Sequence, residues 1–347
     1  MKKYKSIKSI RGIFFMLFLL LVQGCNKDNS TGDNTLTGIG LVVGEAGIAD
    51  KTFNQLAWEG IQKAASEVAL AYQYRVGITV ADYPGLINEL VTMECQLVVA
   101  PGYDKTEAMS EAAMAYPATN FLLIDGVAEP IPTNLLCVGF QFDQASFLAG
   151  FLAAYWSYAQ DSTQPMAAYV AGPQVEEIEQ IRIGYMNGIN HFNTLYSLNI
   201  TVAGGHVSNF VDTIAAAELA NSLIAQGAQI IFAFAGEAGN AALYQAKLGG
   251  IKAIGVDADQ YYTYPEVGDI LLTSCLKHVD NMTYDQVIAR ATGAFHGGRV
   301  VTGNLENKGV GLAPFHDFET QIPDSIKLTI ENIREEIING TIVTGWP

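Results

Sequence analysis

The chain has 347 residues, of which 50% are hydrophobic and 16% are charged, and its formal net charge at pH 7 is −16. This composition excludes a disordered chain, and the acidity disfavours nucleic acid and anionic lipid surfaces as partners. The length suits two domains with separate cores better than one.

The first 25 residues have the layout of a bacterial lipoprotein signal. A basic start with five Lys or Arg residues precedes an apolar run that ends at Gly24 and Cys25. The run is shorter than the ~20 residues that span a bilayer, and the chain becomes polar immediately after Cys25. We therefore expect residues 1–24 to be removed and the Cys25 thiol to carry lipid, palmitate included, with 25–37 as a flexible tether. The alternative is a plain signal peptide with an incidental cysteine.

This signal predicts a protein of the bacterial cell envelope, held at a membrane by acyl chains and facing the periplasm or the cell exterior. Loss of the five cationic residues of the signal leaves the mature chain with a net charge of about −21. Such acidity is compatible with neutral or cationic ligands.

From residue 38 onward, short apolar runs alternate with helical patterns. The expected strands are 38–43, 74–80, 96–100, 121–124, 135–140, 166–171, 200–203, 230–234, 251–256 and 270–273. The expected helices are 51–69, 105–115, 143–158, 175–192, 211–225, 239–248, 279–294 and 323–339. The strands lack strict alternation of apolar and polar residues, which is typical of strands covered by helices on both faces. Strand–helix repetition of this kind predicts parallel sheets in an α/β protein.

Ten strands exceed one comfortable sheet, and proline-containing breaks at 130–132 and 161–165 indicate two lobes. We expect two doubly wound parallel-sheet lobes with a ligand cleft at the carboxyl ends of their strands. The first lobe would comprise 38–140 plus about 276–308, and the second 141–275 plus about 309–347. Cys95, Cys137 and Cys275 lie in apolar runs and are expected to be buried free thiols. The histidines lack metal-ligand spacing, so we expect no metal and no cofactor.

Chemically informative residues lie near or beyond the carboxyl ends of the expected strands. They are Glu45, Phe53, Asn54, Asp125, Phe232, Gly236, Asp257 and Lys277. Carboxyl ends of parallel strands share one edge, so these side chains should converge, and aromatics with carboxylates favour a flat ring bonded at its rim. Carboxylates also accept hydrogen bonds from sugar hydroxyls. Other interpretations remain open, because Asp50 could be a helix N-cap, the two strand-end aspartates turn residues, and the two phenylalanines core.

Five ordered motifs between Gly38 and Phe315 resemble the basic membrane lipoprotein family, the purine-nucleoside-receptor-like substrate-binding lipoproteins of ABC transporters. The first, DKTFNQLAWEG at residues 50–60, is similar to the family signature DKSFNQSAWEG. The others are ASFLAGFLAA at 145–154, IGVDADQ at 254–260, LTSCLKHVD at 272–280 and GVGLAP at 309–314. The resemblance implies a type I periplasmic-binding-protein fold that closes on a nucleoside.

The resemblance also implies roles by position. Phe53 would stack on the base with Asn54 beside it, and Asp125 would bond the base edge. Phe232 would be the opposing stacking residue, with Phe234 as the same-face alternative, while Asp257 and Lys277 would serve the ribose end.

Two positions depart from the family pattern. Gly44 and Glu45 stand where the family has Asp-Val, and Gly236-Glu-Ala-Gly239 stands where it has Gly-Gly-Thr-Gly. Glu45 or Glu237 would then supply the lost carboxylate from a neighbouring position.

The leading hypothesis is a monomeric, lipid-anchored receptor that delivers a nucleoside-like ligand of the purine type to an ABC permease. A sensor that docks a membrane signalling partner is the first alternative. A nucleoside-processing enzyme is the second, but cleavage of a glycosidic bond needs a placed acid or base, and the sequence shows neither an aspartate metal cluster nor an activated nucleophile. We therefore expect the protein not to be an enzyme.

Overall fold

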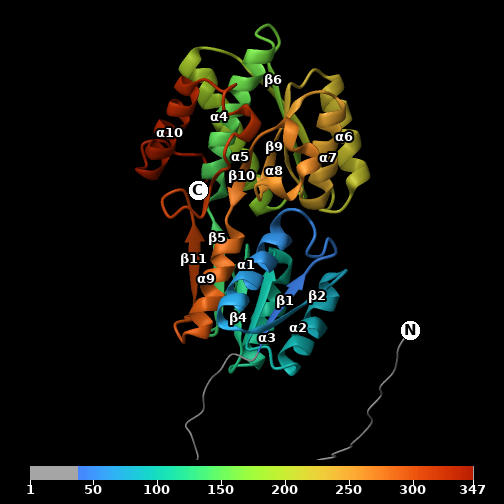
Figure 1. Cartoon of the computed structure of the whole chain (residues 1–347), viewed down its shortest axis with the longest axis vertical. Coiled ribbons are helices and arrows are strands. Elements are labelled where there is room, and N and C mark those ends of the chain that lie inside the picture. Colours follow the sequence, from blue (N-terminus) through green and yellow to red (C-terminus); the bar gives the residue numbers. More distant parts are fainter. Residues whose placement is uncertain (1–37, 347) are drawn as a thin grey trace, which may run out of the picture. The chain divides into compact units, whose positions relative to one another are not determined.

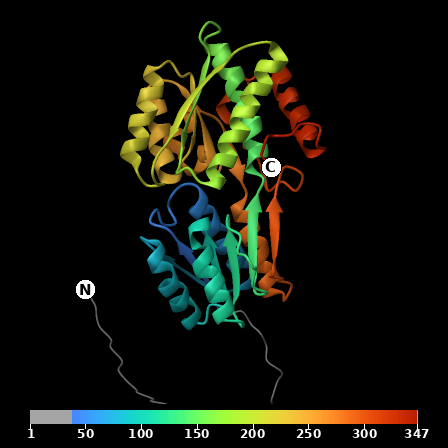
Figure 2. The same cartoon turned by 180° about the vertical axis from the view of Figure 1, so that it is seen from behind.

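A computed structural model of the chain describes residues 38–346, and two six-stranded sheets form its framework (Figures 1 and 2). Cys25, the signal and the tether lie outside the described residues. None of the helices within 38–346 contains a stretch long and apolar enough to cross a membrane.

The first sheet has the strand order β11-β5-β4-β3-β1-β2, and all its neighbouring strands are parallel. Its strands are β1 (Gly38–Val43), β2 (Ala71–Val76), β3 (Leu97–Pro101), β4 (Asn120–Ile124), β5 (Leu135–Phe140) and β11 (Arg299–Gly303). Every residue of β1 and β3 is buried, which explains why their sequences are continuous apolar runs.

The second sheet has the order β12-β10-β9-β8-β6-β7. Its strands are β6 (Met166–Ala171), β7 (Thr201–His206), β8 (Ile230–Phe234), β9 (Lys252–Asp257), β10 (Leu271–Lys277) and β12 (Val310–Leu312). The edge strand β12 pairs antiparallel with β10, whereas the other pairs are parallel.

Helices cover both faces of each sheet. The first sheet carries α1 (Phe53–Val68), α2 (Tyr83–Thr92), α3 (Thr106–Ala115) and α9 (Val279–Ala291). The second carries α4 (Phe142–Gln160), α5 (Glu176–Tyr196), α6 (Thr213–Ala225), α7 (Gly236–Leu248), α8 (Gln260–Thr263) and α10 (Asp324–Ile338). Close packing of α1 on α9 depends on Gly60, because a Cβ there would lie 2.4 Å from the Asp280 carbonyl oxygen. We call the two sheets with their helices the N-lobe and the C-lobe.

The chain passes between the lobes at three places: from β5 to α4, from β10 to α9, and from β11 to β12. Figure 1 shows β5, β11 and α9 side by side at these passages. The lobe limits expected from the sequence stay a prediction, while the two-sheet α/β architecture is confirmed.

Several elements differ from the sequence-based expectations. The strand expected at 74–80 is β2 at Ala71–Val76, and the chain bends at Ile78 and Thr79 soon after the strand ends. The sequence pattern missed α2, β11 and β12 altogether. Cys95, Cys137 and Cys275 are buried and free, as expected.

Candidate functional site

A pocket of about 290 Å³ lies where the strand ends of the two lobes face each other. The N-lobe lines it with residues that follow β1, β3 and β4. The C-lobe contributes the start of α5, the loop before α6, and the ends of β8 and β9. This volume is at the small end of ligand pockets and suits a small molecule rather than a polymer. The pocket wall includes Glu45, Phe53, Asn54, Asp125, Gly236, Asp257 and Lys277 from the sequence-based site.

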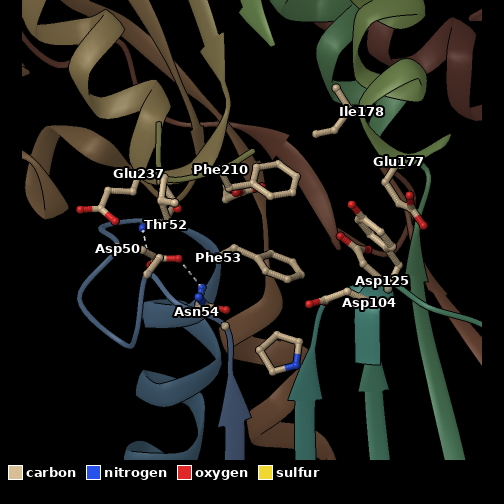
Figure 3. A pocket seen from close by; sticks show the side chains of 18 of the residues that line it. Asp50, Thr52, Phe53, Asn54, Asp104, Asp125, Glu177, Ile178, Phe210 and Glu237 are labelled. Atoms are coloured by element: carbon tan, nitrogen blue, oxygen red, sulfur yellow. Dashed lines mark hydrogen bonds between the residues drawn. The ribbon is translucent and has the colours of Figure 1, made fainter. Parts of the chain in front are cut away.

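Two phenylalanine rings face this pocket from opposite lobes. Phe53 is the first residue of α1, and Phe210 lies in the loop between β7 and α6. Figure 3 shows the two rings one above the other, and both side chains are only partly buried. Opposed aromatic faces of this kind suit a flat ring between them.

Two glycines of the C-lobe make room for Phe210. A Cβ at Gly172 would lie 2.5 Å from the Phe210 ring, and one at Gly236 would lie 3.2 Å from its Cβ. Gly236 also has φ of +57°, a conformation that side chains rarely adopt. The backbone N–H of Ala238 donates to the Phe210 carbonyl over 2.8 Å. Gly236 therefore contributes to the pocket mainly by fixing where Phe210 lies.

The structure does not place Phe232, the residue expected to stack opposite Phe53, on the pocket wall. Phe232 is 0% exposed, does not line the pocket, and packs on Tyr185 and Phe234 with ring centroids 5.2 and 4.8 Å apart. It lies two residues before the end of β8, which places it about 6–7 Å deeper along the strand than Phe234. Phe234, the same-face alternative, does line the pocket.

Phe210 follows a strand whose end the sequence pattern places too early. The strand expected at 200–203 continues to His206, so the loop that reaches the pocket begins three residues later than expected. Phe210 is the one aromatic residue in the segment between β7 and α6. Phe53 was expected near the cleft because it opens the helix after a parallel strand, and Phe210 lies in the corresponding connection before α6.

Asp50 organises the segment that presents Phe53 and Asn54. Its carboxylate accepts hydrogen bonds from the backbone N–H groups of Thr52, Asn54 and Gln55 at 2.9–3.1 Å. It thus satisfies free donors at the start of α1, although the N-cap position that Asp50 could have held is taken by Thr52. Burial raises the pKa of Asp50, against the lowering effect of these bonds.

A buried ion pair joins the two lobes at the pocket wall. Lys277, the last residue of β10, lies 2.5 Å from Oδ2 of Asp125, which follows β4. The ammonium also lies 5.2 Å from the centroid of the Phe53 ring. Burial acts to lower the pKa of Lys277, but Asp125 and Asp257 outweigh it and the pKa is raised.

Asp257, the last residue of β9, belongs to the same electrostatic group. Burial raises its pKa to about 7, Lys277 opposes this shift, and Asp125 and Asp50 add to it. Asp125 and Asp257 both have left-handed backbone conformations, with φ of +56° and +61°. Aspartate tolerates this conformation better than most residues, so these strand ends combine a tight turn with a carboxyl group in the pocket.

Gly44 stands where the family pattern has aspartate. A second charged group, formed by Tyr83, Asp104 and Lys105, lies close to it. Asp104 accepts from the Tyr83 hydroxyl at 2.6 Å and from the buried Lys105 ammonium at 2.7 Å. A Cβ at Gly44 would lie 3.5 Å from the Tyr83 oxygen and 3.9 Å from the Lys105 nitrogen. Asp104 therefore supplies a carboxylate close to Gly44, from β3 instead of β1. From the sequence alone, we expected Glu45 or Glu237 to supply this carboxylate.

Three glutamates complete the pocket wall. Glu45 and Glu237 line the pocket but are exposed, so they lie at its rim. Glu177, at the start of α5, is half-buried, and burial raises its pKa. Figure 3 shows Glu177 on the same side of Phe53 as Asp104 and Asp125, whereas Glu237 and Asp50 lie on the other.

Hydrogen-bond acceptors dominate among the charged side chains of this pocket. Its lining includes seven carboxyl groups and two lysines, Lys105 and Lys277, each of which is paired with a carboxylate. Within residues 38–346, no group of three or more histidine, cysteine, aspartate or glutamate side chains is arranged to hold a metal ion. The arrangement suits a flat ligand that carries several N–H or O–H donors.

Comparison with known proteins agrees with this geometry. Residues 39–345 match the model of the Bmp family, described as ABC transporter substrate-binding protein PnrA-like. The chain belongs to this family. The family match makes it an ABC transporter substrate-binding protein, and the relatives that it matches are substrate-binding proteins as well.

Individual relatives cover nearly the whole chain. The "ABC transporter nucleoside-binding protein BmpA" of Lactococcus lactis subsp. cremoris is 26% identical over 93% of this chain and 94% of its own length. An "uncharacterized lipoprotein" of Pyrococcus abyssi is 25% identical over 97% of this chain and 87% of its own. The crystal structure of a solute-binding protein from Aeropyrum pernix superimposes with a TM-score of 0.83, at 21% identity over 90% of this chain and 94% of that one. This superposition confirms the expected two-lobed fold.

Proposed function

We propose that the protein is a lipid-anchored receptor outside the cytoplasm that binds a purine-nucleoside-like ligand and delivers it to an ABC permease. The observation that carries this proposal is the pair of Phe53 and Phe210, which face one pocket from opposite lobes. A purine ring between them would contact both lobes at once. Base–aromatic stacking of this kind is worth about 1–3 kcal/mol per base.

The polar groups support a purine with donors on its edge. An ionised Asp125 can only accept hydrogen bonds, and Lys277 occupies one of its oxygens. Guanine and hypoxanthine present N–H donors that the remaining acceptor can bind. Asp104, Asp257 and the rim glutamates are the candidates for the sugar hydroxyls. The printed name of the Lactococcus relative, a nucleoside-binding protein, points the same way.

The anchoring part of the proposal rests on the sequence before residue 38. The apolar run that ends at Gly24-Cys25 is the pattern of a lipoprotein signal. The Pyrococcus relative carries the name lipoprotein over an alignment of 97% of this chain. A receptor tethered at Cys25 would hold its pocket within reach of permease subunits in the same membrane.

Mass spectrometry of small molecules that copurify with the protein tests the ligand class without prior choice. Calorimetric titration with guanosine, inosine, adenosine and cytidine then ranks candidates, and we expect guanosine or inosine to bind most tightly. Comparing guanosine, 2′-deoxyguanosine and guanine, with and without Glu45→Ala, shows whether a carboxylate reads the sugar. If none of these compounds binds, the ligand is not a nucleoside.

A further inference from the structure

The loop between β1 and α1 belongs to the N-lobe by connectivity but is held by side chains of the C-lobe. Asn240, on α7, donates from Nδ2 to the Asp50 carbonyl oxygen over 2.9 Å. Thr263, at the end of α8, donates from its hydroxyl to the Lys51 carbonyl oxygen over 2.7 Å. Figures 1 and 2 both show this dark-blue loop reaching the C-lobe beside α7 and α8.

The side chain of Lys51 also reaches from this loop to residues of the C-lobe. Its ammonium lies 3.7 Å from the centroid of the Tyr264 ring and 3.8 Å from the carboxylate of Glu266. The backbone of Lys51 is left-handed, with φ of +65°, which is uncommon for a residue with a side chain. Such a conformation persists when surrounding contacts hold it, and here those contacts come from the other lobe.

These crossings hold the same turn that presents the pocket residues. The Asp50 side chain binds the N–H groups of Thr52, Asn54 and Gln55, so the loop and the first turn of α1 are one hydrogen-bonded unit. A restraint on the carbonyls of Asp50 and Lys51 is therefore a restraint on Phe53 and Asn54.

On the C-lobe side, the hydrogen bonds continue to the pocket wall. Asn240 Oδ1 accepts from Gln260 Nε2 at 2.8 Å, and Gln260 Oε1 accepts from the Val256 N–H at 2.9 Å. Gln260 is 0% exposed, and its own N–H donates to Ser274 Oγ at 3.0 Å. Val256 and its neighbour Asp257 line the pocket. A continuous buried path thus connects the turn of Phe53 to the end of β9, and satisfied buried networks of this kind hold groups in a single geometry.

We propose that Asn240 and Thr263 form an interlobe latch that holds the lobes together without ligand and positions Phe53 against the C-lobe half of the pocket. They are positioning residues, because they act on the pocket through Asp50, Lys51 and Gln260. The latch goes beyond nucleoside binding, and only its effect on affinity rests on the proposed function.

The first test needs no ligand. Thr263→Val keeps the shape of the side chain and removes the donor, while Asn240→Asp removes the donor to Asp50 and keeps the acceptor for Gln260. Thr263→Ser keeps the hydroxyl and should behave as wild type. Thr194→Val is the matched control, because the Thr194 hydroxyl bonds the Asn190 carbonyl within α5. Small-angle X-ray scattering should show a larger radius of gyration than wild type for Thr263→Val and for Asn240→Asp, but not for Thr263→Ser or Thr194→Val. Circular dichroism should confirm that all four variants are folded.

The second test measures guanosine affinity by calorimetry. Loss of one latch bond should weaken binding roughly five- to tenfold for Thr263→Val and Asn240→Asp and leave the other two variants unchanged. If guanosine binds no variant, wild type included, the nucleoside proposal fails while scattering still decides the latch. Equal radii of gyration for wild type and both latch variants would overturn the latch.

Discussion

Lys277 and Asp125 form an ion pair of 2.5 Å between the last strand residue of one sheet and the residue that follows a strand of the other. The Lys277 ammonium lies 5.2 Å from the centroid of the Phe53 ring, so the ion pair brings the two lobes and the aromatic face together at the carboxyl-rich wall of the pocket. Both side chains are almost fully buried, which makes each charge dependent on the other.

Replacing Lys277 with methionine should therefore destabilise the protein. The change leaves Asp125 and Asp257 close together in a buried site without their cation, and removal of one partner of a buried pair costs about 3–5 kcal/mol. Urea unfolding followed by circular dichroism measures this loss. Lys327→Met is the control, since Lys327 pairs with Glu319 and Asp324 at the surface. Equal unfolding free energies for the two variants would contradict the expectation.

Phe53→Ala and Phe210→Ala should each weaken guanosine binding by roughly ten- to a hundredfold, because each removes one stacking face. Phe232→Leu should instead lower the melting temperature and leave affinity close to wild type, since Phe232 is core. Calorimetric titration and thermal melts separate the two effects. A Phe232→Leu variant that folds stably but loses affinity more than Phe210→Ala would return the stacking role to Phe232.

Ionisation of Asp257 should lower the unfolding free energy as the pH rises from about 4 to about 7. Its pKa is about 7 in the folded protein and about 4 in an unfolded chain, so the folded state binds the proton more tightly. This contribution to the unfolding free energy is complete below pH 4 and is lost as the pH rises through 7. Other raised carboxyls, such as Asp50 and Asp143, act in the same direction, so the comparison is between wild type and Asp257→Asn. The variant should lose less stability between pH 5 and pH 8, and identical pH profiles would contradict the raised pKa.

Asp104 should be needed to keep Lys105 in the fold. Burial lowers the pKa of Lys105, and Asp104 is the partner that opposes this shift. Asp104→Ala should cost about 2–3 kcal/mol of unfolding free energy, less than the roughly 3–5 kcal/mol of a fully buried pair, because Asp104 itself is one-third exposed. Gly44→Asp in the same chain should restore much of this loss, since its Cβ would lie 3.9 Å from the Lys105 nitrogen. Failure of the double variant to recover stability in urea unfolding would show that the two carboxylate positions are not equivalent.

Cys25→Ala should abolish attachment to membranes. The expectation rests on the signal that ends at Gly24-Cys25, and the variant should be found soluble or with its signal uncleaved. Fractionation with immunoblotting measures the partition, and Cys95→Ala is a control in which a buried thiol is removed. A processed Cys25→Ala protein that still sediments with membranes would rule out anchoring through this cysteine.

The framework of the fold could be predicted from sequence because most strands are buried on both faces. The expected bounds of β1, β5, β6 and β8 agree with the structure residue for residue. The two strands that the sequence pattern missed, β11 and β12, and the displaced strand β2 are edge strands. Edge strands need less apolar sequence, and three residues of β12 give no periodic signal.

Strand ends explain which site residues the sequence could locate. Asp125, Asp257 and Lys277 end strands or follow them directly, so their place on the pocket wall follows from the parallel sheets. Phe210 and Asp104 lie in loops whose paths depend on tertiary contacts, with Gly172 and Gly236 for the first and with Tyr83 and Lys105 for the second. No local pattern reports those contacts. That these residues bind a ligand stays a prediction.

The carboxyl groups that line the pocket also have a consequence for selection among related metabolites. Both lysines of the lining are already neutralised, so a phosphorylated compound would bring its negative charge to acidic walls without a free cation. If the ligand is the nucleoside proposed above, the pocket would therefore bind nucleosides and exclude nucleotides by electrostatic repulsion. A cell that relies on this receptor for purines would need phosphate removed from extracellular nucleotides before uptake.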